Sequence, residues 1–294
     1  MGFTSHDCVA KLRKLLNTRK IGHGGTLDPA AQGVLPIAVG KATRLLQFLP
    51  TSKAYRARIR LGMATATDDL EGEVISQADT SHLSEGQIIT CLKHFVGTID
   101  QIPPIYSAIK KDGRKLYELA RQGKSVILEQ RKVRIDSIKL LNLTRSQFVE
   151  LEVEISCGPG TYIRAIARDL GKRLGVGGTL AGLVRTQSCG LHLQQSLSFE
   201  EIQSRIDCDS LELIEPSLLL DHLTSVTLDP DYARRWCHGQ LVDLSQSLTL
   251  SKEITVFKAE HYLATYRSDR TFLGISVLYE REGILKLKPK LVIE

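Results

Sequence analysis

Hydrophobic and polar residues alternate most regularly along two segments of the chain. In residues 55–61, Tyr55, Ala57, Ile59 and Leu61 fall on one side, and three arginines fall between them. In residues 149–155, four apolar residues alternate with three glutamates in the same way. A period of two places successive side chains on opposite faces of a strand. The pattern therefore predicts two half-buried β-strands, the first with a basic outer face.

Other segments carry the periods of helices and of buried strands. Helical spacing of apolar residues predicts helices at residues 7–16, 41–49 and 84–95 and after Thr161. Asp7 and Thr161 are expected to cap the first and last of these helices. The continuous apolar run Val34–Val39 predicts a buried strand, and Val96–Ile102 predicts another that ends at Pro103. Residues 1 to about 210 therefore predict a mixed α+β domain.

The last part of the chain has a different pattern of apolar residues. Four short strand patterns follow one another closely, at residues 241–244, 254–257, 262–266 and 272–279. Glycines punctuate the later part of this region, as is typical of small β domains. We therefore expect a small all-β module, with a boundary somewhere between residues 210 and 229.

Charge adds a hint about the partner. The 294 residues are enough for about two domains of ~150 residues each, and the net charge of +6 weakly favours a polyanionic partner. Basic side chains and two tyrosines are interleaved in residues 102–126, a composition that suits a surface for phosphates and stacked bases. A solvated amphipathic helix at residues 115–122 explains the same segment equally well. The basic residues concerned are Lys110, Lys111, Arg114, Lys115, Arg121 and Lys124.

The cysteines and the apolar runs suggest a compartment. The six cysteines are scattered along the chain, so we expect reduced and mostly buried thiols, with no disulfide framework or zinc site. No apolar run approaches the ~20 residues that cross a bilayer. The eight residues before the helical pattern of Val9–Leu16 leave no room for a signal peptide. These observations predict a cytoplasmic protein without a membrane segment.

Residues 22–36, GHGGTLDPAAQGVLP, hold the most informative candidate for chemistry. Asp28 lies in a turn framed by glycines and followed by Pro29, so the backbone can adopt angles that other residues resist. A carboxylate held in this way against a core strand is a candidate catalytic group. Asp before Pro is also a common turn initiator. On this segment alone, the turn is the better interpretation.

A second candidate segment, residues 156–175, breaks a strand at a Gly-Pro-Gly sequence and then begins a helix. Tyr162 and Arg164 fall in the first turn, where side chains and free N–H groups can face a pocket. An arginine there would bind an anion, and beside a carboxylate it would favour the ionised form. When this segment is taken alone, an exposed arginine at the helix start and a tyrosine packed at the strand end are the better explanation.

Taken together and in this order, the segments resemble the TruB family of bacterial tRNA pseudouridine synthases, which act on the uridine at position 55. The resemblance spans nearly all of residues 2–191. Its motifs are GFTSHD, GHGGTLDPAAQGVLP, KAYRARIRLG, IPPIYSAIKKDGRKLYELARQG and GTYIRAIARDLGKRLG, with a weaker match through GLVRTQSCGL. Family members usually begin with a further strand and a Lys-Pro loop before GFTSHD. We therefore expect either that the chain is truncated at its start or that the edge of the core is rebuilt here.

The resemblance implies a fold class and a domain plan. The fold is α+β: a pseudouridine synthase core, with a mixed and largely antiparallel sheet and flanking helices, plus a small C-terminal all-β PUA-like module. The implied catalytic domain covers residues 1–215 and includes an RNA-clasping insertion at about 102–130. The implied PUA-like RNA-binding domain covers residues 222–294.

The resemblance also implies roles for single residues. Asp28 matches the catalytic aspartate, Arg164 the arginine that pairs with it, and Tyr55 an aromatic ring that stacks on the target base. His23 matches a histidine that helps hold the flipped-out nucleotide. Two further residues line the pocket, Tyr162 and the apolar Leu183. The implied RNA-binding residues are Lys110, Lys111, Arg114, Lys115 and Arg121.

The implied activity is the isomerisation of uridine 55 in the T loop of tRNA, with an accompanying role in tRNA folding. Because the reaction is an isomerisation, no redox cofactor, metal or ATP is required. The implied partner is tRNA, bound through its T arm, and no protein partner or membrane is needed. The alternatives are a tRNA-folding protein with a secondary catalytic loop, a related synthase acting on another RNA, and a hydrolase that uses Asp28.

Overall fold

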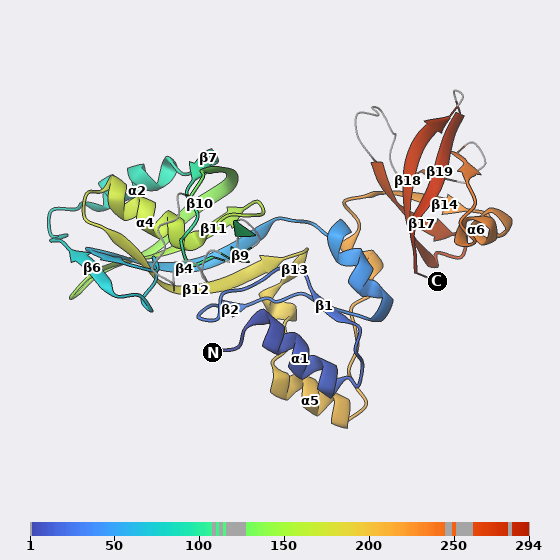
Figure 1. The fold of residues 1–294 in the computed structure, drawn as a ribbon, viewed down its shortest axis with the longest axis horizontal. Helices are drawn as coiled ribbons and strands as arrows, with labels where there is room; N and C mark the ends of the chain where they lie inside the picture. The colour runs from blue at the N-terminus through green and yellow to red at the C-terminus, as the bar shows by residue number, and fades with distance from the viewer. Residues whose placement is uncertain are drawn as a thin grey trace. The chain divides into compact units, whose positions relative to one another are not determined.

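The chain forms two compact units (Figure 1). The computed structural model describes residues 2–107, 110–111, 114–115, 128–244, 249–250, 261–281 and 284–293. The first unit combines Met1–Cys8, Gly25–Pro36 and Thr51–Ser196, and the second combines Val9–Gly24, Ile37–Pro50 and Leu197–Glu294. The domain boundary expected between residues 215 and 222 falls inside the second unit and stays a prediction.

A seven-stranded, largely antiparallel sheet forms the first unit. Its order is β13-β12-β4-β11-β10-β7, and β2 adds to β12 in the parallel sense. Because β4 carries Tyr55 and β12 pairs with β2, which follows Asp28 closely in the chain, the middle of this sheet positions the site. The strands are β2 (Gln32–Gly33), β4 (Lys53–Leu61), β7 (Gly97–Gln101), β10 (Arg131–Arg145), β11 (Val149–Cys157), β12 (Gly178–Ser188) and β13 (Leu191–His192).

The two alternating segments form adjacent central strands, which confirms the expectation of half-buried strands. Tyr55 is 7% exposed, and the three apolar residues that follow it on the same face of β4 are fully buried. On the opposite face, Arg60 lies across from Glu150 of β11. The arginines and glutamates therefore pair across the outer face of the sheet.

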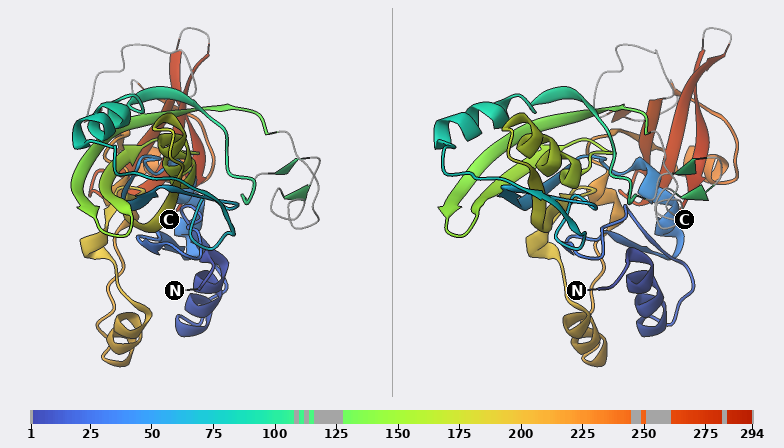
Figure 2. Two further views of the ribbon diagram at one scale, coloured as in Figure 1. Left: turned by 90° about the vertical axis from the view of Figure 1, so that its left-hand side faces the viewer. Right: turned by 60° about the vertical axis from the view of Figure 1, so that its left-hand side comes forward.

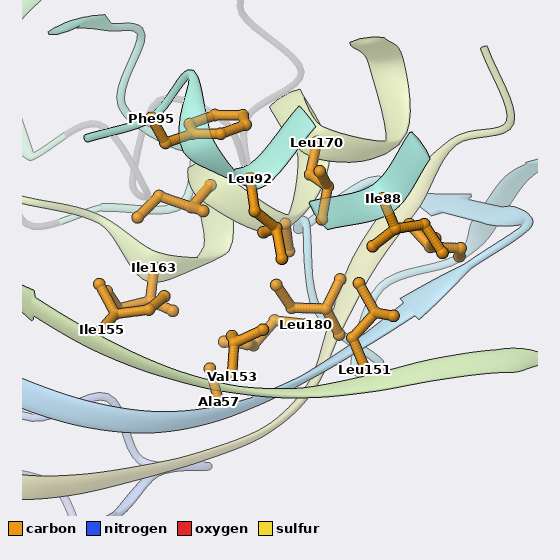
Figure 3. Packing of buried hydrophobic residues seen from close by; sticks show 14 of the residues in the cluster. Ala57, Ile88, Leu92, Phe95, Leu151, Val153, Ile155, Ile163, Leu170 and Leu180 are labelled. Carbon is orange, nitrogen blue, oxygen red and sulfur yellow. The ribbon is translucent and has the colours of Figure 1, made fainter. Parts of the chain in front are cut away.

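Helices α2 (Glu85–Lys93) and α4 (Ile163–Arg173) cover the inner face of the sheet (Figures 1 and 2). Figure 3 shows their side chains meeting those of the strands, with Leu92 and Leu170 above Val153 and Leu180. The apolar stripe of α4 lies on this side, because Ile166 and Leu170 are fully buried. Burial of this shared core holds α4 against the sheet. The site lies at the N-terminal end of this helix.

Local capping differs from the expectation at two helices. Helix α1 (Ser5–Leu15) begins two residues early, because Thr4 caps it: the Asp7 amide donates to Thr4 Oγ1 at 3.1 Å, and the Thr4 amide donates to the Asp7 carboxylate at 2.9 Å. Thr161 does not cap α4, because its hydroxyl donates to the carbonyl of Gly158 at 3.0 Å. Both predicted caps are therefore wrong, although both helices are present.

The apolar run at residues 34–39 is divided between two sheets. The Val34 amide donates to the Arg185 carbonyl at 2.9 Å and so extends the pairing of β2 along β12. Strand β3 (Ile37–Val39) pairs instead with β1 (Ile21–His23) in the second unit. Pro36, which has no N–H, separates the two segments. The predicted single strand was therefore too long, and the segment at Gly40–Phe48 is a 3₁₀ helix, η1.

A six-stranded sheet in order β15-β19-β18-β17-β14-β16 builds the C-terminal module inside the second unit. The sequence patterns at 262–266 and 272–279 are confirmed as β17 and β18, whereas 254–257 lies outside the described residues. The pattern missed helix α6 (Pro230–Cys237), whose Trp236 is fully buried in this module. The strands are β14 (Thr224–Leu228), β15 (Val242–Asp243), β16 (Thr249–Leu250), β17 (His261–Arg267), β18 (Phe272–Arg281) and β19 (Ile284–Val292).

The remaining elements are short. The first unit also holds the hairpin β5 (Met63–Thr65) and β6 (Val74–Gln77), the two-residue strands β8 (Lys110–Lys111) and β9 (Arg114–Lys115), and η2 (Leu193–Gln195). The second unit holds α5 (Phe199–Asp207), which packs against α1, and η3 (Pro216–Leu219). None of the helices in the described part of the chain has the length and apolar composition of a transmembrane span.

The six cysteines all lie among the described residues, and none of them forms a disulfide. The expectation that most are buried was wrong: Cys157 and Cys189 are buried, three are partly buried and Cys208 is exposed.

Candidate active site

The loop that carries Asp28 is held by one buried arginine, Arg185 of β12. Its guanidinium donates to three backbone carbonyls of the loop: Nε to Val34 at 2.7 Å, Nη1 to Thr26 at 3.0 Å and Nη2 to Gly25 at 3.1 Å. Hydrogen bonds from a charged donor are among the strong ones in proteins. The two ends of the loop are therefore tied to the middle of the sheet, with Asp28 between them.

Two small residues complete this attachment. Gly33 has φ +104°, and a Cβ built on it would lie 2.2 Å from the Arg185 carbonyl oxygen, so no larger residue fits there. Ser5, which is 5% exposed, accepts from the Leu27 amide at 2.9 Å and donates to the Leu27 carbonyl at 3.2 Å. The residue directly before Asp28 is therefore fixed through both of its backbone polar groups.

Arg164, in the first turn of α4, faces this loop. Its Nε donates to Asp28 Oδ2 at 3.0 Å, Nη1 to the Thr67 carbonyl at 3.2 Å and Nη2 to the Tyr106 carbonyl at 3.0 Å. Its Nη1 also lies 3.5 Å from the Asp69 carboxylate. Every nitrogen of the guanidinium therefore has an acceptor, and the group is held in one orientation.

The two partners of this ion pair differ in how far their side chains are exposed to solvent. The Arg164 side chain is 9% exposed, whereas the Asp28 side chain is 45% exposed. The interpretation of Arg164 as an exposed helix-start residue is therefore wrong. Asp28 is not a buried acid: Arg164 holds its carboxylate, and nearly half of the side chain stays exposed, as a group that must reach a substrate requires.

Tyr55 lies in β4, opposite Arg185 in the strand register. Burial raises the pKa of the Tyr55 phenol to about 12, and the Arg185 guanidinium beside it opposes part of that shift. The charge of Asp28 raises the pKa of this phenol in the same direction as burial, so the carboxylate lies within electrostatic range of it. At neutral pH the phenol stays protonated, so Tyr55 offers an aromatic ring rather than a basic oxygen.

The structure also places the other predicted pocket residues. Tyr162 is the N-cap of α4, and burial raises the pKa of its phenol, with Asp28 adding in the same direction. Leu183 lies in β12 opposite Ala57 and packs, partly buried, against the core. His23 ends β1 and belongs to the second unit, so its predicted role stays a prediction.

The predicted RNA-binding residues fall in a segment of which only parts are described. The backbones of Lys110 and Lys111 pair with those of Arg114 and Lys115 as strands β8 and β9. Arg121 and the predicted helix at residues 115–122, apart from Lys115, lie outside the described residues.

Sequence reasoning missed several residues that support the site. Gln101 is 1% exposed, and its side-chain amide binds both backbone polar groups of Tyr162, at 2.8 and 3.1 Å. Arg168, one turn after Arg164, donates to the Asp68 carboxylate at 3.0 Å. The adjacent acids Asp68 and Asp69 after a strand, and arginines four residues apart on α4, were the signals available in the sequence.

Comparisons with known proteins agree on the family. The N-terminal domain of the TruB family of pseudouridylate synthases matches residues 13–163. The chain is 54% identical over 255 residues to tRNA pseudouridine synthase B of Gloeothece citriformis, covering 87% of this chain and 83% of the relative. It is 48% identical over 293 residues to tRNA pseudouridine synthase B of Trichormus variabilis, covering 100% of this chain and 95% of the relative.

Solved structures agree on the fold. A chain in an H/ACA RNP bound to a substrate RNA containing 2′-deoxyuridine aligns with a TM-score of 0.74 and 24% identity, covering 100% of this chain and 82% of that one. A chain in a Cbf5-Nop10-Gar1 complex aligns with a TM-score of 0.73 and 25% identity, covering 99% and 82%. The fold is therefore that of a pseudouridine synthase core with a PUA-like C-terminal module. With a family match over half its length and relatives near 50% identity, the chain belongs to the TruB family of pseudouridylate synthases.

Proposed function

We propose that this protein isomerises the uridine at position 55 in the T loop of tRNA to pseudouridine, with Asp28 as the nucleophile. The observation that carries the proposal is the ion pair between Asp28 and the immobilised Arg164, set beside the Tyr55 ring in a member of the TruB family. The names of the curated relatives support tRNA as the substrate.

The reaction breaks the N1–C1′ bond, turns the uracil and joins C5 to C1′, so all atoms of the substrate are kept. A carboxylate can act as nucleophile in such glycosyl chemistry. Arg164 Nε binds Oδ2 of Asp28, and nearly half of the Asp28 side chain is exposed. Attack on the base ring and attack on the sugar are both compatible with this geometry.

A base inside a folded T loop must leave its stack before Asp28 can reach it, which costs a few kcal/mol. Stacking on the Tyr55 ring recovers about 1–3 kcal/mol, and Leu183 contributes apolar surface at the same strands. His23 would help hold the extruded nucleotide. Loss of the C5 proton needs a base, and Asp28 or a water molecule can supply it, because the phenol of Tyr55, with a pKa of about 12, stays protonated.

The basic residues of the 102–130 insertion and the PUA-like module would bind the T arm. The predicted contacts are Lys110, Lys111, Arg114, Lys115 and Arg121, which would add salt-dependent phosphate contacts. The same contacts with the T arm would assist tRNA folding without a protein partner. A cytoplasmic location would follow from the tRNA substrate.

The test is tritium release from tRNA carrying 5-tritiated uridine. We expect release by the wild-type protein, loss of turnover by at least about 10⁴-fold in Asp28→Asn, and nearly unchanged tRNA binding by that variant. A matched tRNA with cytidine at position 55 should release no tritium. Robust turnover by Asp28→Asn would rule out Asp28 as the nucleophile, and binding without any release by the wild type would identify a pure tRNA-folding protein.

A further inference from the structure

Lys53 begins β4, two residues before Tyr55, so both side chains lie on the same face of the strand. Its ammonium extends to the loop that carries Asp28: a Cβ built on Gly25 would lie 3.8 Å from Lys53 Nζ and 3.7 Å from Lys53 Cε. Gly25 is also the residue whose carbonyl accepts from Arg185 Nη2. A cation therefore lies against the held part of the Asp28 loop, on the face of β4 that carries Tyr55.

Lys53 differs from Arg164 because no carboxylate among the described residues neutralises it. Arg164 contacts Asp28 at 3.0 Å. Lys53 has neither a hydrogen bond nor an ion pair with any described residue, and the groups that act on its charge are the cation Arg185 and two cysteine thiols. Burial lowers the pKa of the Lys53 ammonium, and the Arg185 charge lowers it further. A partly buried ammonium in such a setting is stabilised by an anion.

Exposure along β4 follows the order in which the parts of a bound nucleotide would lie. Lys53, at the start of the strand, is partly exposed, whereas Tyr55 is 7% exposed. Their Cα atoms are separated by about 6.6 Å, at about 3.3 Å per residue of a strand. A base that stacks on Tyr55 lies inside the site, and the phosphates that flank it stay with the RNA backbone toward solvent. Lys53 is therefore placed where the backbone of that nucleotide passes.

We propose that Lys53 Nζ binds a phosphate oxygen next to the flipped-out uridine. The inference rests on the proposed function and adds a backbone-binding residue to it. A phosphate supplies the anion that the described part of the protein does not offer to this ammonium, and lysine binds phosphate as a compact point charge. The contact differs from those predicted in residues 102–130, because it comes from the central sheet and acts on the target nucleotide itself.

Lys53→Met is the direct test, because methionine keeps an unbranched apolar chain and removes the charge. The melting temperature of the RNA-free protein should stay equal or rise, since a partly buried charge is removed and no ion pair with a described residue is lost. On tRNA, kcat/KM should fall about 10–100-fold, the range of one lost hydrogen bond between charged groups. The fall should lie in KM rather than kcat, and the slope of log kcat/KM against log salt concentration should become shallower by about 0.7–1.

Lys172→Met is the matched control. Lys172 is an exposed lysine in the last turn of α4, whereas the site lies at the start of this helix. The variant removes the same charge from the same unit, so we expect kcat/KM within about twofold of wild type. An equal loss in both variants would show that net charge alone guides the RNA, and it would overturn the role of Lys53.

Modified substrates identify the phosphate that Lys53 binds. T-arm RNAs can carry one neutral methylphosphonate, either 5′ or 3′ of the target uridine. We expect the wild type to bind one of them about as weakly as Lys53→Met binds the unmodified RNA, with little further loss in the variant, because the same contact is removed twice. If each methylphosphonate changes binding to the wild type and to Lys53→Met by the same factor, Lys53 contacts neither phosphate and the proposal is wrong.

The outcomes separate this inference from the proposed function. An active wild type together with unchanged KM and salt dependence in Lys53→Met would overturn the role of Lys53 alone. A lower melting temperature with unchanged salt dependence would identify a structural role and would also overturn it. A wild type that releases no tritium from unmodified tRNA would contradict the proposed function itself. The Kd values of the methylphosphonate RNAs, which need no turnover, would then still decide whether Lys53 binds a phosphate.

Discussion

Arginines face carboxylates in two regions of the first unit, and the two settings differ in everything except the chemistry of the pair. At the candidate active site, Arg164 is 9% exposed and contacts Asp28 at 3.0 Å. On the outer face of the sheet, Arg56 is 58% exposed and lies 3.5 Å from Glu152, which is itself 40% exposed. Only the first guanidinium is also held by backbone carbonyls, those of Thr67 and Tyr106.

This difference in exposure shows which ion pairs can position a catalytic group. An exposed pair contributes about 0–1 kcal/mol, because water competes and both side chains lose freedom when they pair. A buried guanidinium whose remaining donors are satisfied has lost that freedom already during folding. Arg164 can therefore position Asp28, whereas Arg56 mainly keeps the outer face of the sheet soluble.

The largest expected effect on turnover comes from Arg164→Lys, which alters the buried ion pair. A lysine keeps the charge but offers one nitrogen in place of three that point in fixed directions. It cannot serve Asp28, Thr67 and Tyr106 together, so we expect kcat/KM for tritium release to fall about 10²–10³-fold, the scale seen when one preorganised donor is removed. Single-turnover rates with saturating tRNA would measure the loss in the chemical step.

The matched change on the outer face is Arg60→Lys. Arg60 Nε donates to Glu150 Oε1 at 2.8 Å, so the same substitution also alters an arginine–carboxylate pair there. We expect turnover within about twofold of wild type and a loss of about 1 kcal/mol in the free energy of unfolding, at the upper end for surface pairs because the two side chains are only 23% and 20% exposed. Equal loss of turnover in both variants would mean that the setting of Arg164 is not what matters.

A smaller effect is expected from Ser5→Ala, which tests whether the loop around Asp28 must be rigid. Without the hydroxyl, the amide and carbonyl of Leu27 lose their partner, at a cost of about 1–3 kcal/mol in the free energy of unfolding. We also expect kcat to fall several-fold, since Leu27 directly precedes Asp28. Urea unfolding and tritium release measure the two effects.

Ser84→Ala separates rigidity of the loop from stability of the unit. The Ser84 hydroxyl caps α2 by accepting from the Gln87 amide. Loss of this cap should lower the free energy of unfolding by about 1 kcal/mol. Because the Asp28 loop is not altered, the kcat of this variant should stay at the wild-type value. If both variants lost kcat in parallel with stability, the hydrogen bonds of Ser5 would have no specific role at the site.

The outer and inner faces of the sheet also explain how far the sequence could be interpreted. The alternation in β4 and β11 reports directly on two neighbouring environments, water and core, so both strands were predicted from residues 55–61 and 149–155 alone. Within residues 34–39, Val34 extends the pairing of β2 and residues 37–39 form β3, and this division depends on hydrogen bonds with Arg185, 151 positions away along the chain. No local period carries that information.

The candidate site follows the same rule. Asp28 and Arg164 stood out through their glycine-rich and helix-start contexts, and the family motifs joined them before the structure brought them to 3.0 Å. Gln101 had no such signal, because its role arises from contacts with the backbone of Tyr162. Such residues become visible only when segments distant in the sequence are placed together.

The smallest expected effect comes from Arg56→Gln, which removes the positively charged partner of an exposed ion pair. Glu152 then loses a partner at 3.5 Å but remains solvated, because its side chain is 40% exposed. We expect a change of less than about 1 kcal/mol in the free energy of unfolding, which should shrink further in 1 M salt, where the Debye length is about 3 Å. Turnover of tRNA measured at a fixed ionic strength should be unchanged. A loss of turnover with unchanged stability would instead place the outer face of β4 in contact with the RNA, and the division between a structural and a catalytic face of this sheet would have to be abandoned.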